Sequence, residues 1–236
     1  MIPGKFEYHR PGTVDEVVAL LSEHGDEGRV VAGGHSLIPM MKLRLAAPSH
    51  LIDLQGLDAL KGVSEDGGDI VIGAMVTQAE VLESALLADK CPILGECASL
   101  IADPQVRNCG TIGGNVANGD PGNDMPAVMM ALNASYVLTG PGGERTVAAR
   151  AFYEAAYFTA REDDELLTGI RIPLPSVGHG HAYVKPKRKV GEHETAAPAG
   201  IPNMDAHPCA SAALYRTTPG QAPLQAANTR AHGTAV

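Results

Sequence analysis

The chain has 236 residues, enough for one large domain or two small ones, and its 44% hydrophobic and 19% charged residues are typical of a globular protein. A formal net charge of -9 and the absence of tryptophan argue against a general nucleic-acid or anionic-lipid binder. The sequence has no apolar run long enough to cross a bilayer and no signal-peptide core near its start, so a cytoplasmic protein, not a membrane protein, is expected.

The N-terminal part predicts two helices and two short strands. The helix over 13–25 begins with a capping pair, Thr13 and Glu16, and ends at Gly25. Three elements are expected after it: a strand at 29–32, a helix at 37–46 and a strand at 50–54.

The middle of the chain mixes strands and helices without regular alternation. Strands are expected at 69–77, 135–140, 144–149 and 165–175, and helices at 77–89, 91–102 and 125–134. The segment 110–124 is rich in glycine and is expected to be mostly loop. This mixture predicts an α+β fold rather than a doubly wound parallel sheet.

The segment from Ala196 to the end has a different composition. It is rich in Ala, Pro, Thr and Gln and sustains neither a strand nor a helix period. We expect it to be a poorly ordered tail.

The four cysteines have no metal-binding spacing. Cys91, Cys97, Cys109 and Cys209 form no CxxC pair and no iron–sulfur pattern. Buried free thiols are therefore expected, and no metal ligand is expected in the chain.

Two glycine-rich turns, GGHS at 33–36 and GTIGGN at 110–115, each follow apolar sequence. Backbone N–H groups in such turns bind anions without basic side chains, and we expect those around Gly113 and Gly114 to do so. Taken alone, the first turn is better explained as an ordinary connection between a strand and a helix. Neither turn matches GxxxxGK[ST] or GxGxxG, so the two together predict a dinucleotide diphosphate held in another way.

The segments AGGHSLIPMMKLRL and IADPQVRNCGTIGGNVANGDPGNDMPAVMMAL resemble the FAD-binding medium subunits of molybdenum hydroxylases, most closely those of the aerobic carbon monoxide dehydrogenase type. The family includes the flavin domain of xanthine dehydrogenase, and the resemblance runs from Met1 to about Thr195. It implies the two-subdomain α+β FAD module shared with vanillyl-alcohol oxidase-like enzymes. The implied parts are a first subdomain at 1–55, a second at 56–177, and the start of a C-terminal domain with an atypical end at 178–236.

The resemblance also implies which residues hold FAD. The first loop contributes Ala32, Gly33, Gly34, His35 and Ser36, and the second contributes Thr111, Ile112, Gly113, Gly114 and Asn115. Further contacts are implied for Ile101, Asp124, Leu167, Lys185 and His193. His35 is expected to bind rather than to act as an acid or base, because no partner group is placed near it, and no catalytic residue is expected.

Several of these residues have ordinary alternatives. Asp124 equally suits the cap of the helix at 125–134, and Ile101 and Leu167 equally suit the hydrophobic core. Lys185 lies in a basic run, so a solvated or partner-facing strand is the alternative to a place beside the flavin.

The sequence departs from the family pattern in two places. His193 stands where close relatives carry a tyrosine that lies over the flavin. After Ala197 nothing reads like the C-terminal domain of the family, so that domain is expected to be missing or truncated, as a frameshift would produce. A hydrophobic pattern in another reading frame of the gene would support the frameshift.

The resemblance implies electron transfer as the function. An iron–sulfur small subunit would deliver electrons to FAD on this chain, and a quinone or cytochrome would accept them. A molybdenum-cofactor large subunit would oxidise the substrate, and the three subunits would form a dimer of heterotrimers. Peripheral association of this complex with the inner face of the membrane is compatible with the expected cytoplasmic location. Two alternatives stay open: a related hydroxylase acting on aldehydes or N-heterocycles, and a truncated, non-catalytic FAD-binding remnant.

Overall fold

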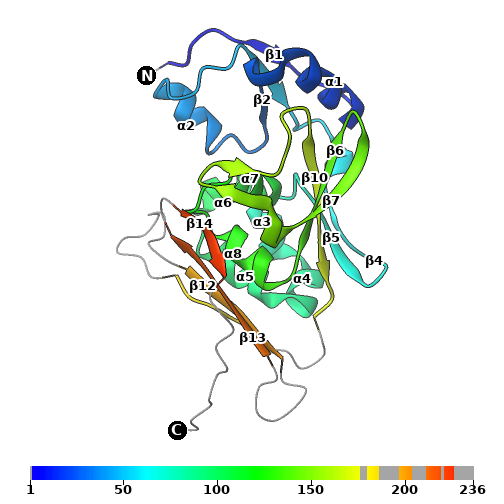
Figure 1. The fold of residues 1–236 in the computed structure, drawn as a ribbon, viewed down its shortest axis with the longest axis vertical. Helices are drawn as coiled ribbons and strands as arrows, with labels where there is room; N and C mark the ends of the chain where they lie inside the picture. The colour runs from blue at the N-terminus through cyan, green and yellow to red at the C-terminus, as the bar shows by residue number, and fades with distance from the viewer. Residues whose placement is uncertain (1, 176–179, 186–196, 204–210, 219–220, 226–236) are drawn as a thin grey trace.

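The computed structural model describes residues 2–175, 180–185, 197–203, 211–218 and 221–225. An N-terminal lobe lies at one end, a layer of helices against a twisted sheet forms the middle, and a smaller sheet lies at the other end (Figure 1). Within the described residues, no helix is both long enough and apolar enough to span a membrane.

The N-terminal lobe is built on a three-stranded parallel sheet in the order β1-β3-β2. Its elements are β1 (Glu7–His9), α1 (Val14–His24), β2 (Gly28–Val31), α2 (Leu37–Lys42) and β3 (His50–Asp53). The predicted start of α1 is confirmed, because the Thr13 hydroxyl accepts a hydrogen bond from the Glu16 N–H at 3.2 Å. Gly25 ends the helix with a φ of 52°.

The larger sheet has five antiparallel strands in the order β4-β5-β10-β6-β7. The strands are β4 (Val63–Asp66), β5 (Asp69–Gly73), β6 (Ser135–Gly140), β7 (Gly143–Ala148) and β10 (Leu166–Pro173). The late strand β10 lies in the centre, with Ile170 opposite Ile72 of β5 and opposite Tyr136 of β6.

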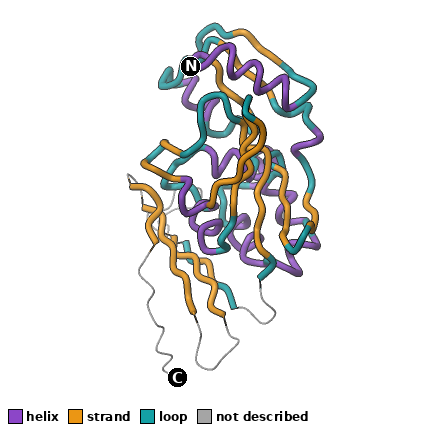
Figure 2. Tube along the Cα trace, turned by 45° about the vertical axis from the view of Figure 1, so that its right-hand side comes forward, coloured by secondary structure: helices purple, strands orange, loops and turns teal. Residues whose placement is uncertain are grey.

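Helices gather against this sheet, as Figure 2 shows. They are α3 (Gln78–Glu83), α4 (Ala85–Lys90), α5 (Pro92–Ser99), α6 (Pro104–Cys109), α7 (Ile112–Ala117), α8 (Met125–Ala131) and α9 (Ala149–Phe152). The main core lies between the two layers and includes Ile70, Ile172 and Leu94, and every residue of α8 is buried. A second apolar cluster joins α1 to Leu57, Leu60 and Leu166, so residues after 55 complete the core of the first lobe. The boundary between subdomains at 55 and 56 stays a prediction.

One local prediction is wrong and another is incomplete. The helix expected over 77–89 is broken at Ser84, whose hydroxyl accepts a hydrogen bond from the Leu87 N–H and so starts α4. The segment 110–124 is mostly loop, as expected, but its residues 112–117 form the helix α7, which was not predicted and which Thr111 caps.

The expectation of a tail without regular structure after Ala196 is wrong for the described residues. Strands β11 (Ala182–Tyr183), β12 (Ala197–Asn203), β13 (Ser211–Thr218) and β14 (Gln221–Gln225) form an antiparallel sheet. The strand signal is weak in the sequence because β12 contains two prolines, two alanines and a glycine. A two-stranded hairpin is formed by β8 (Tyr153–Ala155) and β9 (Phe158–Thr159).

The expected burial of the cysteines holds for Cys91 and Cys97, whereas Cys109 is exposed and Cys209 lies outside the described residues. Burial raises the pKa of the Cys91 thiol to about 12, so little thiolate exists at neutral pH. We therefore expect a thiol-alkylating reagent to modify Cys109 and to spare Cys91 and Cys97 in the folded protein. Peptide mass mapping before and after unfolding tests this, and rapid native labelling of Cys91 would contradict it.

Candidate functional site

One cavity of about 780 Å³ lies between the N-terminal lobe and helices α6 and α7. Its wall includes thirteen of the fifteen predicted binding residues: Ala32, Gly33, Gly34, His35, Ser36, Ile101, Thr111, Gly113, Gly114, Asn115, Asp124, Leu167 and Lys185. These residues come from both glycine-rich turns and from segments far away in the sequence. The fold therefore brings the two turns to one place, as the sequence analysis requires.

Of the other two predicted residues, Ile112 does not line the cavity and His193 is not described. The Ile112 side chain is fully buried in the main core, and its N–H donates a hydrogen bond to the Val76 carbonyl at 2.8 Å. His193 lies outside the described residues, so its place beside the ligand stays a prediction.

The first glycine turn connects the end of β2 to the start of α2 and leaves its amides open. Gly34 has a φ of 72°, a conformation that favours glycine. Among the described residues, the N–H groups of 33–36 have no hydrogen-bond acceptor, and the His35 Nδ1 lies 2.7 Å from the Gly33 carbonyl oxygen. These amides border the cavity and are available to an anion.

The second glycine turn uses its amides internally, contrary to expectation. The Gly113 N–H donates to the Ala74 carbonyl at 3.0 Å, and the Gly114 N–H donates to the Thr111 hydroxyl at 3.0 Å. The prediction that these two amides form an open anion-binding nest is therefore wrong. The reason is that Thr111 caps α7 while residues 74–78 pair with the turn.

The glycines of both turns instead allow backbones to approach closely. A Cβ at Gly33 would lie 2.2 Å from the Cys109 carbonyl oxygen, and one at Gly113 would lie 2.5 Å from the Ala74 oxygen. The contact of Gly33 with Cys109 joins the first turn to the end of α6, just before the second turn. Glycine at these positions sets the shape of the cavity.

Asp124 and Lys185 form a buried ion pair in the cavity wall. The Lys185 Nζ lies 2.7 Å from the Asp124 Oδ1, and the two side chains are 3% and 7% exposed. Tyr183 donates a hydrogen bond to the same carboxylate at 2.5 Å, and Lys185 also approaches the Leu100 carbonyl at 3.4 Å. The solvated alternative for Lys185 is therefore wrong, and Asp124 makes no capping hydrogen bond to α8.

Ile101 and Leu167 are core residues and cavity residues at once. Both are buried, both belong to the main hydrophobic core, and both border the cavity. The two interpretations of these side chains are compatible.

Gln78 is a cavity residue that sequence reasoning missed. Its side chain is 2% exposed, and neither its Nε2 nor its Oε1 has a hydrogen-bond partner in the structure. A buried amide without partners is costly in a protein interior and calls for an explanation. One sequence pattern indicates its position: Gln78 lies three residues before the apolar Val81, so the two side chains share the inward face of α3.

Charged side chains that were not predicted also border the cavity. Arg161 donates to the Glu165 carbonyl at 2.8 Å, and burial lowers the pKa of its guanidinium. Hydrogen bonds from Arg145 hold the pKa of the Glu165 carboxyl below its usual range, so this carboxylate stays ionised at neutral pH. Positively and negatively charged side chains therefore lie together in the cavity wall, and the chain as a whole has a net negative charge.

Known proteins share this sequence and this fold. The family model described as the FAD binding domain in molybdopterin dehydrogenase matches residues 4–175. The carbon monoxide dehydrogenase medium chain of Afipia carboxidovorans is 56% identical over 226 residues, which cover 96% of this chain and 78% of that protein.

Two solved structures extend the comparison. A chain of the CO dehydrogenase from Oligotropha carboxidovorans superposes with a TM-score of 0.93 at 56% identity, covering 95% of this chain and 79% of that one. A chain of quinoline 2-oxidoreductase from Pseudomonas putida 86 gives a TM-score of 0.90 at 31% identity, covering 95% and 78%. The predicted α+β flavin module is thereby confirmed, as is FAD as the cofactor. The chain belongs to the family of FAD-binding domains of molybdopterin dehydrogenases, as a flavoprotein subunit of the molybdenum hydroxylase type.

Proposed function

We propose that this chain holds FAD in the cavity between the two glycine turns and serves as the electron-transfer subunit of a carbon monoxide dehydrogenase-like molybdenum hydroxylase. The observation that carries the proposal is the convergence of thirteen predicted binding residues on one cavity of about 780 Å³. A cavity of this size is in the range of protein sites for cofactors and similar ligands.

The chemistry of the wall fits a dinucleotide. Open amides at 33–36 suit a diphosphate, and the unpartnered Gln78 amide offers a donor and an acceptor to a polar group of the ligand. Ile101 and Leu167 give apolar surface beside these groups. The site thus combines apolar walls with a few convergent polar groups, as cofactor sites do.

Residues of this chain bind and orient the cofactor, while FAD when bound supplies the redox chemistry. The Asp124–Lys185 pair places an ammonium group in the wall where its position is held by three oxygen contacts. If this ammonium group lies beside the redox group of bound FAD, it would favour the negatively charged form, with its effect reduced by the paired Asp124 carboxylate. The open amides at 33–36 would hold the diphosphate, and the close contact of Gly33 with Cys109 keeps this turn beside the second turn.

The proposed partners follow from the relatives. The protein from Afipia carboxidovorans is named as the medium chain of a carbon monoxide dehydrogenase, and we propose that this chain likewise assembles with an iron–sulfur subunit and a molybdenum subunit. Electrons would enter from the iron–sulfur subunit and leave to a quinone or cytochrome. Identity is 56% to this relative and 31% to the quinoline enzyme, which favours carbon monoxide over an N-heterocycle as the substrate of the complex.

Reconstitution of the purified chain with FAD tests the site. We expect the desalted protein to retain the visible flavin spectrum at about one FAD per chain and, mixed with a reduced iron–sulfur partner subunit, to show bleaching of that spectrum. A folded protein that stays colourless would overturn the proposed cavity. Retained FAD that the partner cannot reduce would instead support the alternative of a non-catalytic remnant.

A Gln78→Met substitution separates ligand binding from stability. Without FAD, we expect the variant to unfold at higher urea concentration, because it removes a buried amide that costs about 1–3 kcal/mol when unpaired. With FAD, we expect the affinity to fall by about tenfold, the value of one lost hydrogen bond. Urea denaturation and flavin titration measure the two effects.

The exposed Gln55 provides the matched control. Gln55→Met is expected to change neither quantity by more than about 0.5 kcal/mol. Unchanged FAD affinity in the Gln78 variant would show that this amide does not face the ligand.

A further inference from the structure

Three histidines from separate elements meet on the N-terminal lobe, away from the cavity described above. The His9 Nε2 lies 3.0 Å from the His50 Nδ1, and the His24 ring stacks on the His50 ring with centroids 3.7 Å apart. One nitrogen from each of the three rings lies within 4.8 Å of one from each of the others. None of the three residues borders the large cavity.

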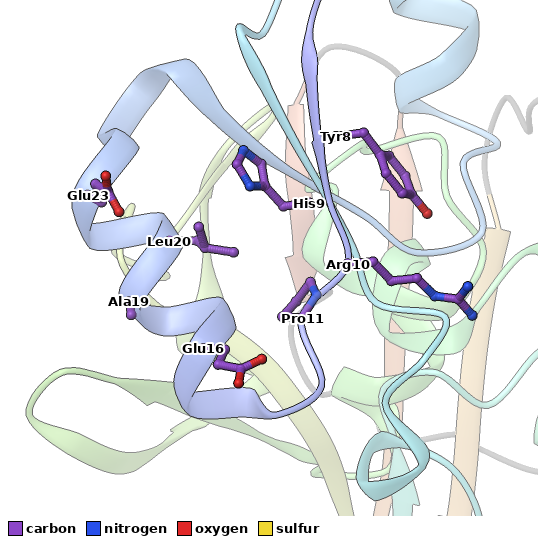
Figure 3. A pocket seen from close by; sticks show the side chains of 8 residues that line it. All are labelled: Tyr8, His9, Arg10, Pro11, Glu16, Ala19, Leu20 and Glu23. Atoms are coloured by element: carbon purple, nitrogen blue, oxygen red, sulfur yellow. The ribbon is translucent and has the colours of Figure 1, made fainter.

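The fold explains why these side chains meet. Glu7 pairs with His50 in the parallel register of β1 and β3, and alternation along β1 places His9 on the same face as Glu7. His24 is the last residue of α1, the helix that lies over this face. Figure 3 shows His9 projecting from the strand toward α1, whereas Tyr8 and Arg10 project to the opposite side.

A carboxylate lies beside the three histidines. The Glu7 Oε2 lies 3.7 Å from the His50 Nδ1, and the Glu7 side chain is 75% exposed and therefore free to turn. The three histidines are partly buried, so the ring nitrogens are accessible yet held by the surrounding elements. Three imidazoles and one carboxylate form a donor set typical of zinc.

We propose that Glu7, His9, His24 and His50 form a binding site for a divalent transition-metal ion of the zinc class. In a tetrahedral zinc site the ligand nitrogens are about 3.4 Å apart, as Zn–N bonds of about 2.0–2.1 Å require. The His9 and His50 nitrogens are 3.0 Å apart because they share a hydrogen bond, which the ion would replace with a small increase in their separation. The His24 ring has to leave its stack and turn, because two parallel rings do not direct their lone pairs at one ion.

The site would tie three elements together. With three imidazoles and a carboxylate bound, the ion has no open position, so its role is structural rather than catalytic. It would connect β1 and α1, which precede the first glycine turn, to β3, which pairs with β2, the strand that leads into that turn. This proposal stands independently of the FAD cavity.

Zinc titration of the full chain tests the proposal, with zinc chloride alone as the probe and calorimetry as the readout. We expect each chain to bind one Zn²⁺ ion tightly and to melt at a higher temperature when the ion is bound. Because metal binding depends on each ligand, zinc affinity is expected to fall about 100-fold or more in His9→Asn, His24→Asn and His50→Asn. His181→Asn, which lies outside the cluster and bonds Glu96, is expected to bind zinc as the unchanged chain does. Equal zinc affinity in the unchanged chain and in a triple variant of His9, His24 and His50 would overturn the site.

Two measurements keep the test decisive if the variants fold poorly. Cobalt(II) bound to the unchanged chain is expected to give the strong visible bands of a tetrahedral ion. The ring-nitrogen NMR signals of His9, His24 and His50 are expected to shift together at one equivalent of Zn²⁺. Ring-nitrogen signals that do not shift when Zn²⁺ is added would overturn the proposal, and this test needs no substitution.

Discussion

A Gly33→Ala chain is expected to lose its bound FAD. The new methyl group would lie 2.2 Å from the Cys109 carbonyl oxygen and 2.8 Å from the Gly110 Cα, and both are backbone atoms that no rotamer change moves away. The two turns therefore have to separate, which displaces the open amides at 33–36. We expect FAD affinity to fall more than about 100-fold, or about 2.7 kcal/mol, and apo stability to fall by about 1–3 kcal/mol.

Flavin titration and urea denaturation of the Gly33 variant measure these losses. Gly95→Ala is the control, because a Cβ at this position in α5 has no neighbouring atom within 4 Å. That change is expected to leave FAD binding intact and to stabilise the helix by up to about 1 kcal/mol. A Gly33→Ala protein with unchanged flavin absorbance would show that the close contact is not needed for the site.

Breaking the buried pair of Asp124 and Lys185 is expected to cause the largest loss of stability. An Asp124→Asn change leaves the ammonium group, 3% exposed, without its counter-charge. Removal of one partner of a buried pair costs about 3–5 kcal/mol, whereas replacement of both costs much less. We therefore expect Asp124→Asn and Lys185→Met each to lower the free energy of unfolding by about this amount, and the double variant to recover part of it.

The unchanged chain, the two single variants and the double variant form a double-mutant cycle. Urea denaturation of these four proteins gives the coupling energy between Asp124 and Lys185. The exposed pair of Asp58 and Lys61, 2.6 Å apart, is the matched control, and Lys61→Met is expected to cost less than about 1 kcal/mol. Additive losses in the cycle would contradict a coupled buried pair. Flavin titration of the same proteins shows whether the pair also contributes to cofactor affinity.

Local sequence signals predicted most of the regular structure. The capping residues Thr13 and Thr77 start helices where expected, and the apolar alternation around Ile70 and Ile172 predicts strands that are present. The helix α7 was missed because its two glycines are poor helix formers, and packing against Ala74 outweighs that preference. Strand pairing in β12 was missed because prolines and alanines hide the period of two.

The candidate site was predicted mainly through two glycine motifs, and the structure changes what those motifs do. Glycine at 113 was expected to expose an amide, yet that amide is bonded to Ala74 and the glycine instead permits close packing. A hydrogen-bond partner distant in the sequence leaves no local signal, so this outcome was not predictable. The same holds for the partners of Lys185 and for the meeting of three histidines.

The central position of β10 has a consequence for synthesis of the protein. Its residues, Leu166–Pro173, pair with β5 and β6, strands that leave the ribosome well before it. Until β10 is made, β5 and β6 each present an unpaired edge, and such edges promote association between incomplete chains. The nascent chain therefore passes through a vulnerable stage that ends only when β10 inserts, and chaperone contacts are expected to concentrate in that interval of translation.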